Sequence, residues 1–262
     1  MRPSSINLLG VRVDDLTGDE LLLYVERAVR HGEKRIFAYL TIHGINLAQK
    51  IPWFKGFLQR SDIAYADGEG VRWGVRVLGE SLSPRIPLTR WVWSLAQFCE
   101  TNGFSLYLLG STDDSIRKAC AALRSKLNNL NIVGQHNGYF EKDGLESERV
   151  VENINASAPN ILLVGFGMPD QEKWIEQNVE RLRVNVIMPS GSCFDFVGGG
   201  KSSSPEWMSR NGLEWLHRLS QEPGRLFGRY VLGIPLFFLR VCAQRALNGK
   251  AVRISQATTH TT

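Results

Sequence analysis

Short apolar runs alternate with longer helical patterns along most of this chain, and this alternation restricts the fold more than any other feature. Most of the runs have four to six residues, the length of a strand that is buried on both faces of a sheet. The expected strands are 36–41, 63–66, 105–109, 131–133, 161–164 and 184–188. The expected helices are 46–60, 89–102, 115–127, 147–156 and 170–182. This order predicts an α/β fold with a mostly parallel, Rossmann-like sheet flanked by helices.

Positive charge is concentrated in the last quarter of the chain. Nine of the 31 Lys and Arg residues, but only three of the 26 Asp and Glu residues, follow Gly200. This quarter therefore carries a net charge of +6, whereas residues 1–200 carry −1. We expect an α/β body over 1–200, a basic amphipathic helical appendage over 201–254 and a disordered polar tail over 255–262. A basic segment on a neutral body indicates an anionic membrane surface, a nucleic acid or a phosphorylated ligand.

Three arginines of the appendage, Arg218, Arg225 and Arg229, stand among aromatic and aliphatic residues. Guanidinium groups are permanently charged forks that match phosphate oxygens, so the segment could meet a phosphorylated ligand at a membrane surface. An ordinary amphipathic helix with a solvated basic face would have the same composition. The longest apolar stretch, 230–239, is about half as long as a membrane-spanning helix, so we expect contact with a membrane and no crossing of it.

Other patterns exclude several classes of protein. The four cysteines are widely spaced and lack histidines at ligand spacing, which indicates thiols in a reducing compartment and neither a zinc site nor a disulfide framework. The N-terminus lacks a basic region followed by an apolar core, so we expect no signal peptide and a cytoplasmic location. Neither the GxGxxG fingerprint nor a P-loop occurs, which disfavours a nicotinamide-binding domain.

Two expected strands end in glycine turns directly before helices, one at Gly110 and one at Gly165 and Gly167. Backbone N–H groups in such turns can approach a phosphate or a sugar at the carboxyl edge of a parallel sheet. Tight turns also need glycine for structural reasons alone, so the pattern is only a weak indication of a binding site.

Six motifs, in order, resemble the WecG/TagA/CpsF family of bacterial glycosyltransferases over residues 7–245. They are Thr41-Ile-His-Gly-Ile-Asn46, Ala66-Asp67-Gly68-Glu-Gly70, Gly134 with Asn137-Gly138-Tyr139-Phe140, Gly165-Phe-Gly-Met-Pro169-Asp-Gln171-Glu172, Phe194-Asp195-Phe196, and the segment from Gly212 to Tyr230. The resemblance implies an enzyme of cell-surface polysaccharide or teichoic acid assembly. It implies inverting transfer from a UDP-sugar to a sugar on a polyprenyl diphosphate, without a metal ion, at the cytoplasmic face of the inner membrane.

The residue types agree with this chemistry. Inversion needs a carboxylate that takes the proton of the acceptor hydroxyl, and the departing diphosphate needs a metal ion or fixed cations. The chain has no Asp-x-Asp pair, the usual holder of a metal ion on a nucleotide sugar, but it has the arginines of the appendage. We therefore expect a metal-independent hexosyltransferase without a cofactor. The resemblance also implies self-association through the body.

The resemblance assigns the catalytic base to Asp67, which follows an expected strand and precedes a glycine; a plain Asp-Gly turn is the structural alternative. The expected substrate-binding residues are Thr41, His43, Asn46, Arg85, Gly110, Gly165, Gly167, Gln171, Arg218, Arg225 and Arg229. His43, Asn46 and Arg85 could instead have purely structural roles. Phe194-Asp195-Phe196 is expected to organise a loop.

The chain departs from the family pattern at three positions. Asp170 stands where a lysine is usual, Ser203-Ser204 where Arg-Ala is usual, and Leu88 where a glycine is common. The first change removes a cation near the expected nucleotide, the second puts a basic contact in doubt, and the third suggests a different acceptor. No residue discriminates among N-acetylmannosamine, its uronic acid and glucose as the donor sugar. Glucosyl transfer to polyprenyl-diphosphate-glucose, as in xanthan-type polysaccharide assembly, is one expectation.

Two other functions stay open. A non-catalytic protein that binds nucleotides or nucleic acids would also interleave basic and aromatic residues. The abundance of Leu, Ile and Phe in the basic segment argues against it, and we expect no nucleic-acid partner. A nucleotide-sugar epimerase would share the fold but normally needs the nicotinamide fingerprint that is missing here.

Overall fold

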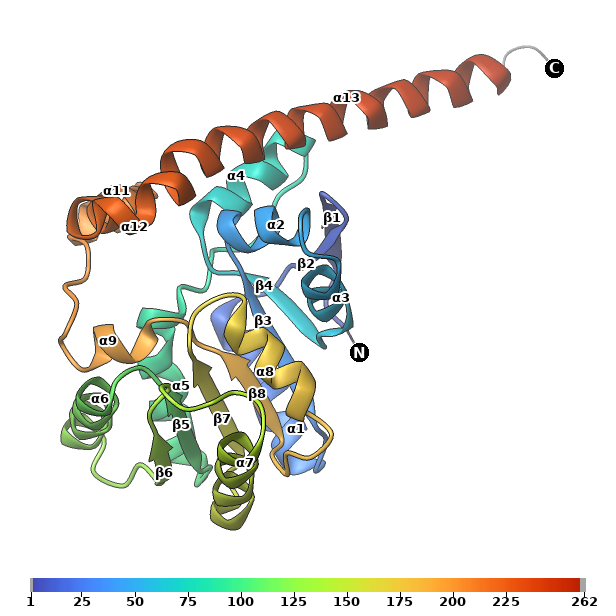
Figure 1. Cartoon of the computed structure of the whole chain (residues 1–262). Coiled ribbons are helices and arrows are strands. Elements are labelled where there is room, and N and C mark those ends of the chain that lie inside the picture. The colour runs from blue at the N-terminus through green and yellow to red at the C-terminus, as the bar shows by residue number, and fades with distance from the viewer. Residues whose placement is uncertain (1, 260–262) are drawn as a thin grey trace.

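The structure, a computed structural model, describes residues 2–259 and contains an eight-stranded sheet in the order β1-β2-β4-β3-β8-β7-β5-β6 (Figure 1). The strands are β1 Ser5–Leu8, β2 Val11–Asp14, β3 Arg35–Leu40, β4 Ile63–Ala66, β5 Leu106–Gly110, β6 Ile132–His136, β7 Ile161–Gly165 and β8 Val186–Pro189. Only β1 is antiparallel to its neighbour. The predicted α/β class with a mostly parallel sheet is therefore confirmed.

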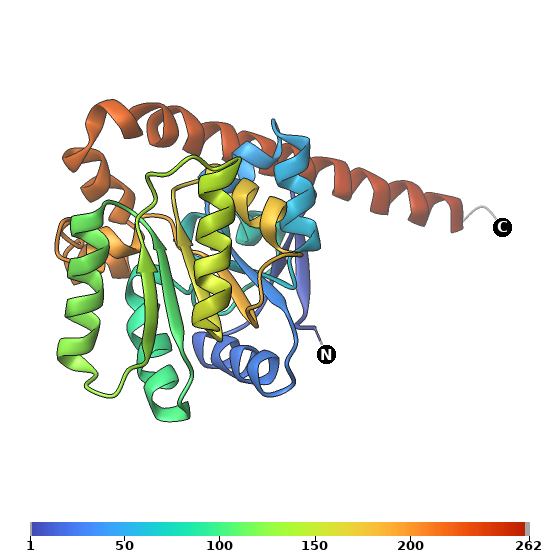
Figure 2. The ribbon, with the colours of Figure 1, turned by 60° about the horizontal axis from the view of Figure 1, so that its bottom comes forward.

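Helices cover both faces of this sheet (Figure 2). The helices are α1 Gly18–Arg30, α2 Ile42–Ala48, α3 Pro52–Arg60, α4 Glu69–Leu78, α5 Leu88–Asn102, α6 Asp113–Lys126, α7 Leu145–Ser157, α8 Asp170–Asn178, α9 Cys193–Val197, α10 Glu206–Arg210, α11 Glu214–Gln221, α12 Pro223–Phe227 and α13 Gly233–Thr259, with the π-helical turn η1 Gly228–Leu232 before α13. Helices α1, α5, α6 and α9 pack on one face, and α2, α3, α4, α7, α8 and α13 pack on the other.

The central strands divide their side chains between two hydrophobic cores. Along β5, Leu106 and Leu108 join one core, and Tyr107 and Leu109 join the other. This alternation follows from the two-residue period of a strand, and it explains why the buried strands read as continuous apolar runs. Because these strands are parallel, their carboxyl ends meet at one edge of the sheet. The turns from the strands into the helices lie close together there.

The N-terminal hairpin and the break after α2 are not evident in the apolar pattern. Leu9 and Gly10, which join β1 to β2, both have positive φ angles, a backbone conformation that leucine rarely adopts. The expected helix 46–60 consists of two helices, because Pro52 begins α3 and cannot continue α2. Helices α1, α4 and α9 add to the expected set, and α9 contains Phe194-Asp195-Phe196, which were expected to organise a loop.

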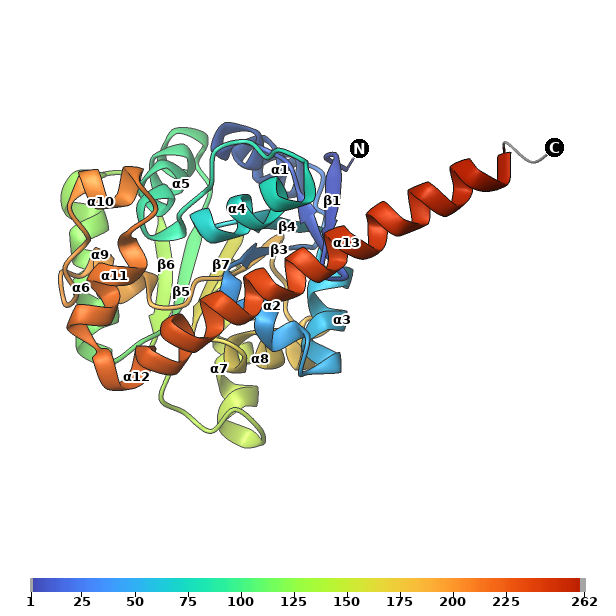
Figure 3. The same ribbon diagram turned by 90° about the horizontal axis from the view of Figure 1, so that it is seen from above.

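Helix α13 crosses α4 and α2 and then extends beyond the body (Figure 3). Its inner face is anchored by Phe237 and Val241, which are fully buried. Phe237 can pack this closely because a Cβ at position 74 would lie only 2.5 Å from its ring, and position 74 is glycine. The tail expected to be disordered is helical over residues 255–259, and residues 260–262 lie outside the described part of the chain.

The helical stretch Pro223–Asn248 is longer than its central apolar run. It has 26 residues, and an 18-residue window within it has a mean hydropathy of 1.6, so by length and composition alone it could cross a membrane. The expectation that no segment is long enough to cross a membrane was based only on the apolar run 230–239. Contacts with the body, described below, hold one side of this stretch.

Candidate active site

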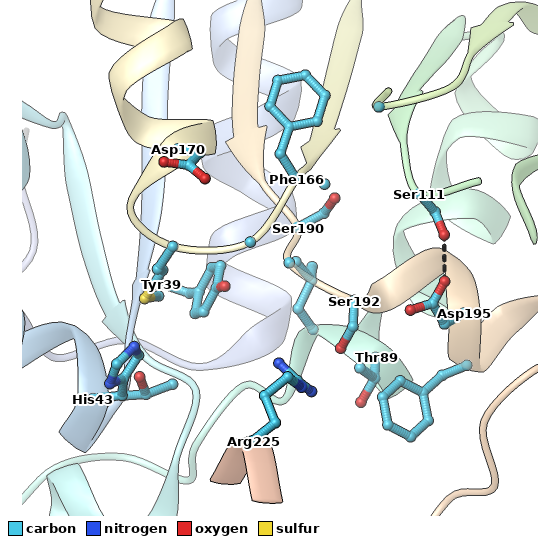
Figure 4. A pocket seen from close by; sticks show the side chains of 18 of the residues that line it. Tyr39, His43, Thr89, Ser111, Phe166, Asp170, Ser190, Ser192, Asp195 and Arg225 are labelled. Carbon is cyan, nitrogen blue, oxygen red and sulfur yellow. Dashed lines mark hydrogen bonds between the residues drawn. The ribbon is translucent and has the colours of Figure 1, made fainter. Parts of the chain in front are cut away.

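A cavity of about 800 Å³ opens at the carboxyl edge of the parallel strands (Figure 4). From one side of the sheet to the other, the turns after β4, β3, β8, β7, β5 and β6 contribute Asp67, Thr41, Ser190, Gly165, Ser111 and Gly138. The appendage contributes Arg218, Arg225, Arg229 and Tyr230. The cavity is therefore built between the body and the appendage.

A smaller cavity of about 180 Å³ lies between α4 and the appendage. Trp73, Trp215 and Ile234 line this cavity and not the larger one. Both cavities share Thr41, His43, Asp67, Arg218, Arg229 and Tyr230. Asp67 therefore stands where the two cavities meet.

The carboxylate of Asp67 is fixed by one of its oxygens. Its Oδ1 accepts a hydrogen bond from the backbone N–H of Leu88 at 2.8 Å, and Oδ2 accepts none from the described residues. Burial raises the pKa of Asp67 above its usual 3.8, although the Leu88 N–H and the charges of Arg218 and Arg85 favour the ionised form. A carboxylate with a raised pKa and a free oxygen has the properties of a general base.

Arg85 holds the Asp67 turn to the appendage. Its guanidinium donates to Glu214 at 2.8 Å, to both oxygens of Ser209 at 2.9 and 3.1 Å, and to the backbone oxygen of Asp67 at 3.4 Å. It also lies 3.7 Å from Glu69. Arg85 borders only the smaller cavity, and these partners occupy its charge.

Thr41 and His43 border both cavities from the start of α2. The Thr41 hydroxyl caps α2 by accepting from the N–H of Gly44 at 3.2 Å, so its own hydrogen can still be donated. Burial, together with the charges of Arg229 and Arg225, lowers the pKa of His43 to about 4. His43 is therefore neutral at neutral pH and acts there as a hydrogen-bonding group, not as a cation.

The three arginines of the appendage face the larger cavity from α11, α12 and η1. Arg218 stacks over the ring of Phe196, with 5.0 Å between the guanidinium carbon and the ring centre. Arg225 is paired with Glu222, and the buried Nε of Arg229 has no hydrogen-bond partner among the described residues. Within residues 2–259, no group of three or more His, Cys, Asp or Glu side chains is placed to hold a metal ion.

Asn46, Gln171 and Gly110 are absent from the lining of both cavities. Asn46 faces α13: its amide donates to the Gly233 carbonyl at 2.7 Å and accepts from Arg240 at 2.8 Å. Both ends of the amide therefore hold the appendage to the body, and the expected substrate contact of Asn46 stays a prediction.

Gln171 is completely buried behind the cavity. Its Oε1 accepts from the N–H groups of Gly167 and Gly191 at 3.2 and 2.9 Å, so it joins the turns after β7 and β8. Its Nε2 donates to Tyr39 at 3.2 Å and to Glu172 at 2.7 Å. The amide of Gln171 thus shapes the cavity wall, and its expected contact with the donor stays a prediction.

The glycine turns pack on each other. A Cβ at Gly110 would lie 2.3 Å from the carbonyl oxygen of Gly165, and one at Gly165 would lie 2.7 Å from the carbonyl oxygen of Gly191. Gly110 thus has a structural role behind the cavity, whereas Gly165 and Gly167 border it. The glycines allow three neighbouring strand ends to approach closely.

A chain of polar contacts, which the motifs do not indicate, crosses the rim of the larger cavity. Ser111 donates to Asp195, and Lys201 lies 3.4 Å from Asp195 and 2.8 Å from Glu222. Glu222 in turn pairs with Arg225. Only the positive charge of Lys201 could be noted from the sequence, since its partners lie six and 21 residues away.

Comparison with known proteins places this geometry in a family context. A profile described as "Glycosyl transferase WecG/TagA/CpsF family" matches residues 6–251. Enzymes of Staphylococcus aureus strains MW2, NCTC 8325 and MRSA252 are each 25% identical over 250 residues, or 95% of this chain and 96% of theirs. Each is named N-acetylglucosaminyldiphosphoundecaprenol N-acetyl-beta-D-mannosaminyltransferase.

We predict that Gln171→Ala lowers the free energy of unfolding by about 2–3 kcal/mol, because it removes a fully buried amide that joins the N–H groups of two turns. Urea unfolding measures this change. Gln97→Ala, which removes an exposed amide, should change the free energy by less than about 0.5 kcal/mol. Unchanged stability of Gln171→Ala would contradict the structural role.

Proposed function

Because the chain belongs to the WecG/TagA/CpsF family of glycosyltransferases, we propose that it transfers a hexosyl, N-acetylhexosaminyl or hexuronyl group from a UDP-sugar to a sugar on a polyprenyl diphosphate. The observation that carries this proposal is the position of Asp67 where two cavities meet. The names of the Staphylococcus enzymes, which describe an acceptor on diphosphoundecaprenol, support this class of acceptor.

The two cavities differ in a way that suits two substrates. The larger one combines glycine turns with three arginines, which suits a nucleoside diphosphate. The smaller one is bordered by Trp73 and Trp215 and reaches Ile234 on α13. Flat aromatic faces next to an apolar helix suit a sugar ring that is attached to a lipid. We assign the donor to the larger cavity and the acceptor sugar to the smaller one.

The reaction in this assignment is a single displacement at the anomeric carbon of the donor, with Asp67 as the base. The acceptor hydroxyl oxygen forms a bond to the anomeric carbon of the donor while the bond from that carbon to the phosphate oxygen breaks. Oδ2 of Asp67 takes the hydroxyl proton, and UDP leaves with the bonding electrons. Attack from the side opposite the leaving group inverts the anomeric centre. The N–H of Leu88 holds the carboxylate in one orientation while the proton moves.

Fixed cations neutralise the departing diphosphate in this scheme. Arg218, Arg225 and Arg229 border the larger cavity from the appendage, and their charge is independent of pH. Positive groups already in place stabilise developing negative charge without reorganisation. We therefore propose a metal-independent reaction in which guanidinium groups take the place of a divalent cation.

The outer side of the appendage suits the surface of a membrane. Phe227, Leu232, Leu236 and Leu239 are exposed there, whereas Phe237 is buried against the body. Arg240, which binds Asn46, and Arg245, which binds the backbone oxygen of Val77, also hold α13 to the body. A helix held on one side and apolar on the other suits a peripheral position in the headgroup region, so we propose that the enzyme lies on the cytoplasmic face of the inner membrane.

We predict that transfer from a panel of UDP-sugars to a short-chain polyprenyl-diphosphate sugar persists in EDTA. Asp67→Asn should lower kcat by roughly 10²–10⁴-fold, because the amide cannot accept the hydroxyl proton. Asp114→Asn, an exposed carboxylate on α6, is the matched control and should retain full activity. Complete loss of wild-type transfer in EDTA would refute metal independence, and full activity of Asp67→Asn would refute the base.

We also predict an acid limb in the pH profile of kcat/KM that belongs to Asp67. The base works as the carboxylate, so activity is constant above its raised pKa and falls as the pH drops through it. Arg85→Gln removes a charge that favours the ionised form and should shift this limb to higher pH. His43→Gln should leave the limb in place, because the charges that act on the Asp67 carboxyl are those of Arg218, Arg85 and Glu214. A limb that follows His43 would contradict the assignment.

We predict that the double variant Leu236→Glu/Leu239→Glu binds vesicles containing anionic lipid at least about tenfold more weakly in sedimentation, because two exposed leucines no longer enter the headgroup region. Leu23→Glu, an exposed leucine on α1, is the control and should bind like the wild type. Equal binding by the double variant and the wild type would rule out this face as the membrane contact.

A further inference from the structure

A buried hydroxyl without a partner lies in the wall of the larger cavity. Ser190, in the turn after β8, is only 4% exposed, yet it borders this cavity (Figure 4). Its backbone N–H donates to Val164 at 2.6 Å, but its Oγ has no hydrogen-bond partner among the described residues. A hydroxyl removed from water and left unpaired destabilises a folded chain, so its presence at a binding cavity indicates a role toward a ligand.

A second hydroxyl lies against the same turn. The phenolic oxygen of Tyr39, on the neighbouring strand β3, would be 2.7 Å from a Cβ at Gly191. This oxygen accepts from Gln171 at 3.2 Å, and its hydrogen is donated to no acceptor among the described residues. Burial and the nearby carboxyl of Glu172 raise the pKa of Tyr39, so the phenol stays protonated. Tyr39 and Ser190 therefore offer two neutral O–H donors to one region of the cavity.

This pair comes from the strand ends of the body. Across the sheet edge, the Ser190 turn lies between the Thr41 turn and the Gly165 turn, with Asp67 one strand beyond Thr41. The guanidinium groups, which suit phosphate, come from the appendage. Neutral hydroxyl donors next to the strand end of the base suit an oxygen of a sugar substituent, such as a hydroxyl or an amide carbonyl.

We propose that Ser190, together with Tyr39, binds an oxygen of a substituent on the donor hexose, and that Ser190 determines which sugar the enzyme prefers. This inference rests on the proposed function, since it assumes a UDP-sugar in the larger cavity. A site that is built to hydrogen-bond a substrate group discriminates strongly against substrates without it, because its own buried group is then left unpaired. One hydroxyl can therefore decide among hexoses that share the same nucleotide.

Calorimetric titration with UDP, UDP-glucose, UDP-glucuronate, UDP-N-acetylglucosamine and UDP-N-acetylmannosamine tests the proposal. The wild type should bind at least one of these sugars more tightly than UDP alone. Ser190→Ala should bind the preferred UDP-sugar about tenfold or more weakly than the wild type does, while its affinity for UDP stays within about twofold of the wild-type value. Its thermal midpoint should be equal to or higher than that of the wild type, because an unpaired buried hydroxyl has been removed.

Tyr65→Phe is the matched control. The Tyr65 hydroxyl is also buried and without a partner among the described residues, but it borders neither cavity. Its removal should leave the sugar preference unchanged. This control separates the effect of removing an unpaired hydroxyl from the effect of removing it at the cavity wall.

The other outcomes overturn the inference in distinguishable ways. If Ser190→Ala keeps the sugar preference, Ser190 does not bind the sugar. An equal loss of affinity for UDP and UDP-sugars would place the contact on the nucleotide diphosphate, and a lower thermal midpoint would assign Ser190 a structural role. Failure of the wild type to bind any UDP-sugar would refute the proposed donor, and with it this inference.

Discussion

The packing of the appendage against the body is the interaction on which the site depends. Neither cavity is complete without the appendage, since the body supplies Asp67 and the appendage supplies the arginines. This packing is apolar at Phe237, which contacts α4 where Gly74 leaves room for its ring. It is polar at Arg85, whose partners lie in both parts. The two kinds of contact fix the appendage to the body at two places.

The same contacts set the electrostatics at Asp67. Burial beneath the appendage raises the pKa of this carboxyl, and the charges of Arg218 and Arg85 act in the opposite direction. Glu214, which pairs with Arg85, adds a negative charge nearby and so limits the effect of that arginine. A carboxylate in such surroundings binds a proton more readily than it would in water. The same side chains therefore hold the appendage against the body and set the basicity of Asp67.

The sequence predicts the sheet better than the orientation of its polar residues. Buried parallel strands read as apolar runs, and the six expected strands all occur, whereas the β1–β2 hairpin contains a leucine with positive φ that no local pattern predicts. Motifs identified Asp67, Thr41 and the arginines, all of which border the cavities. They could not show that Asn46 and Gln171 point away from them, because residue type does not fix direction. Lys201 and Ser190 belong to no motif, and only tertiary contacts reveal them.

The pairing of Arg225 with Glu222 determines how an anion would bind at the rim of the larger cavity. Arg225 is already neutralised by a carboxylate, which Lys201 also holds. In the proposed function, a phosphate that binds Arg225 would take the place of Glu222, and Glu222 would keep Lys201 as its counterion. Such an exchange would conserve the number of ion pairs at the rim. The anion that the phosphate replaces would then be a carboxylate of the protein itself.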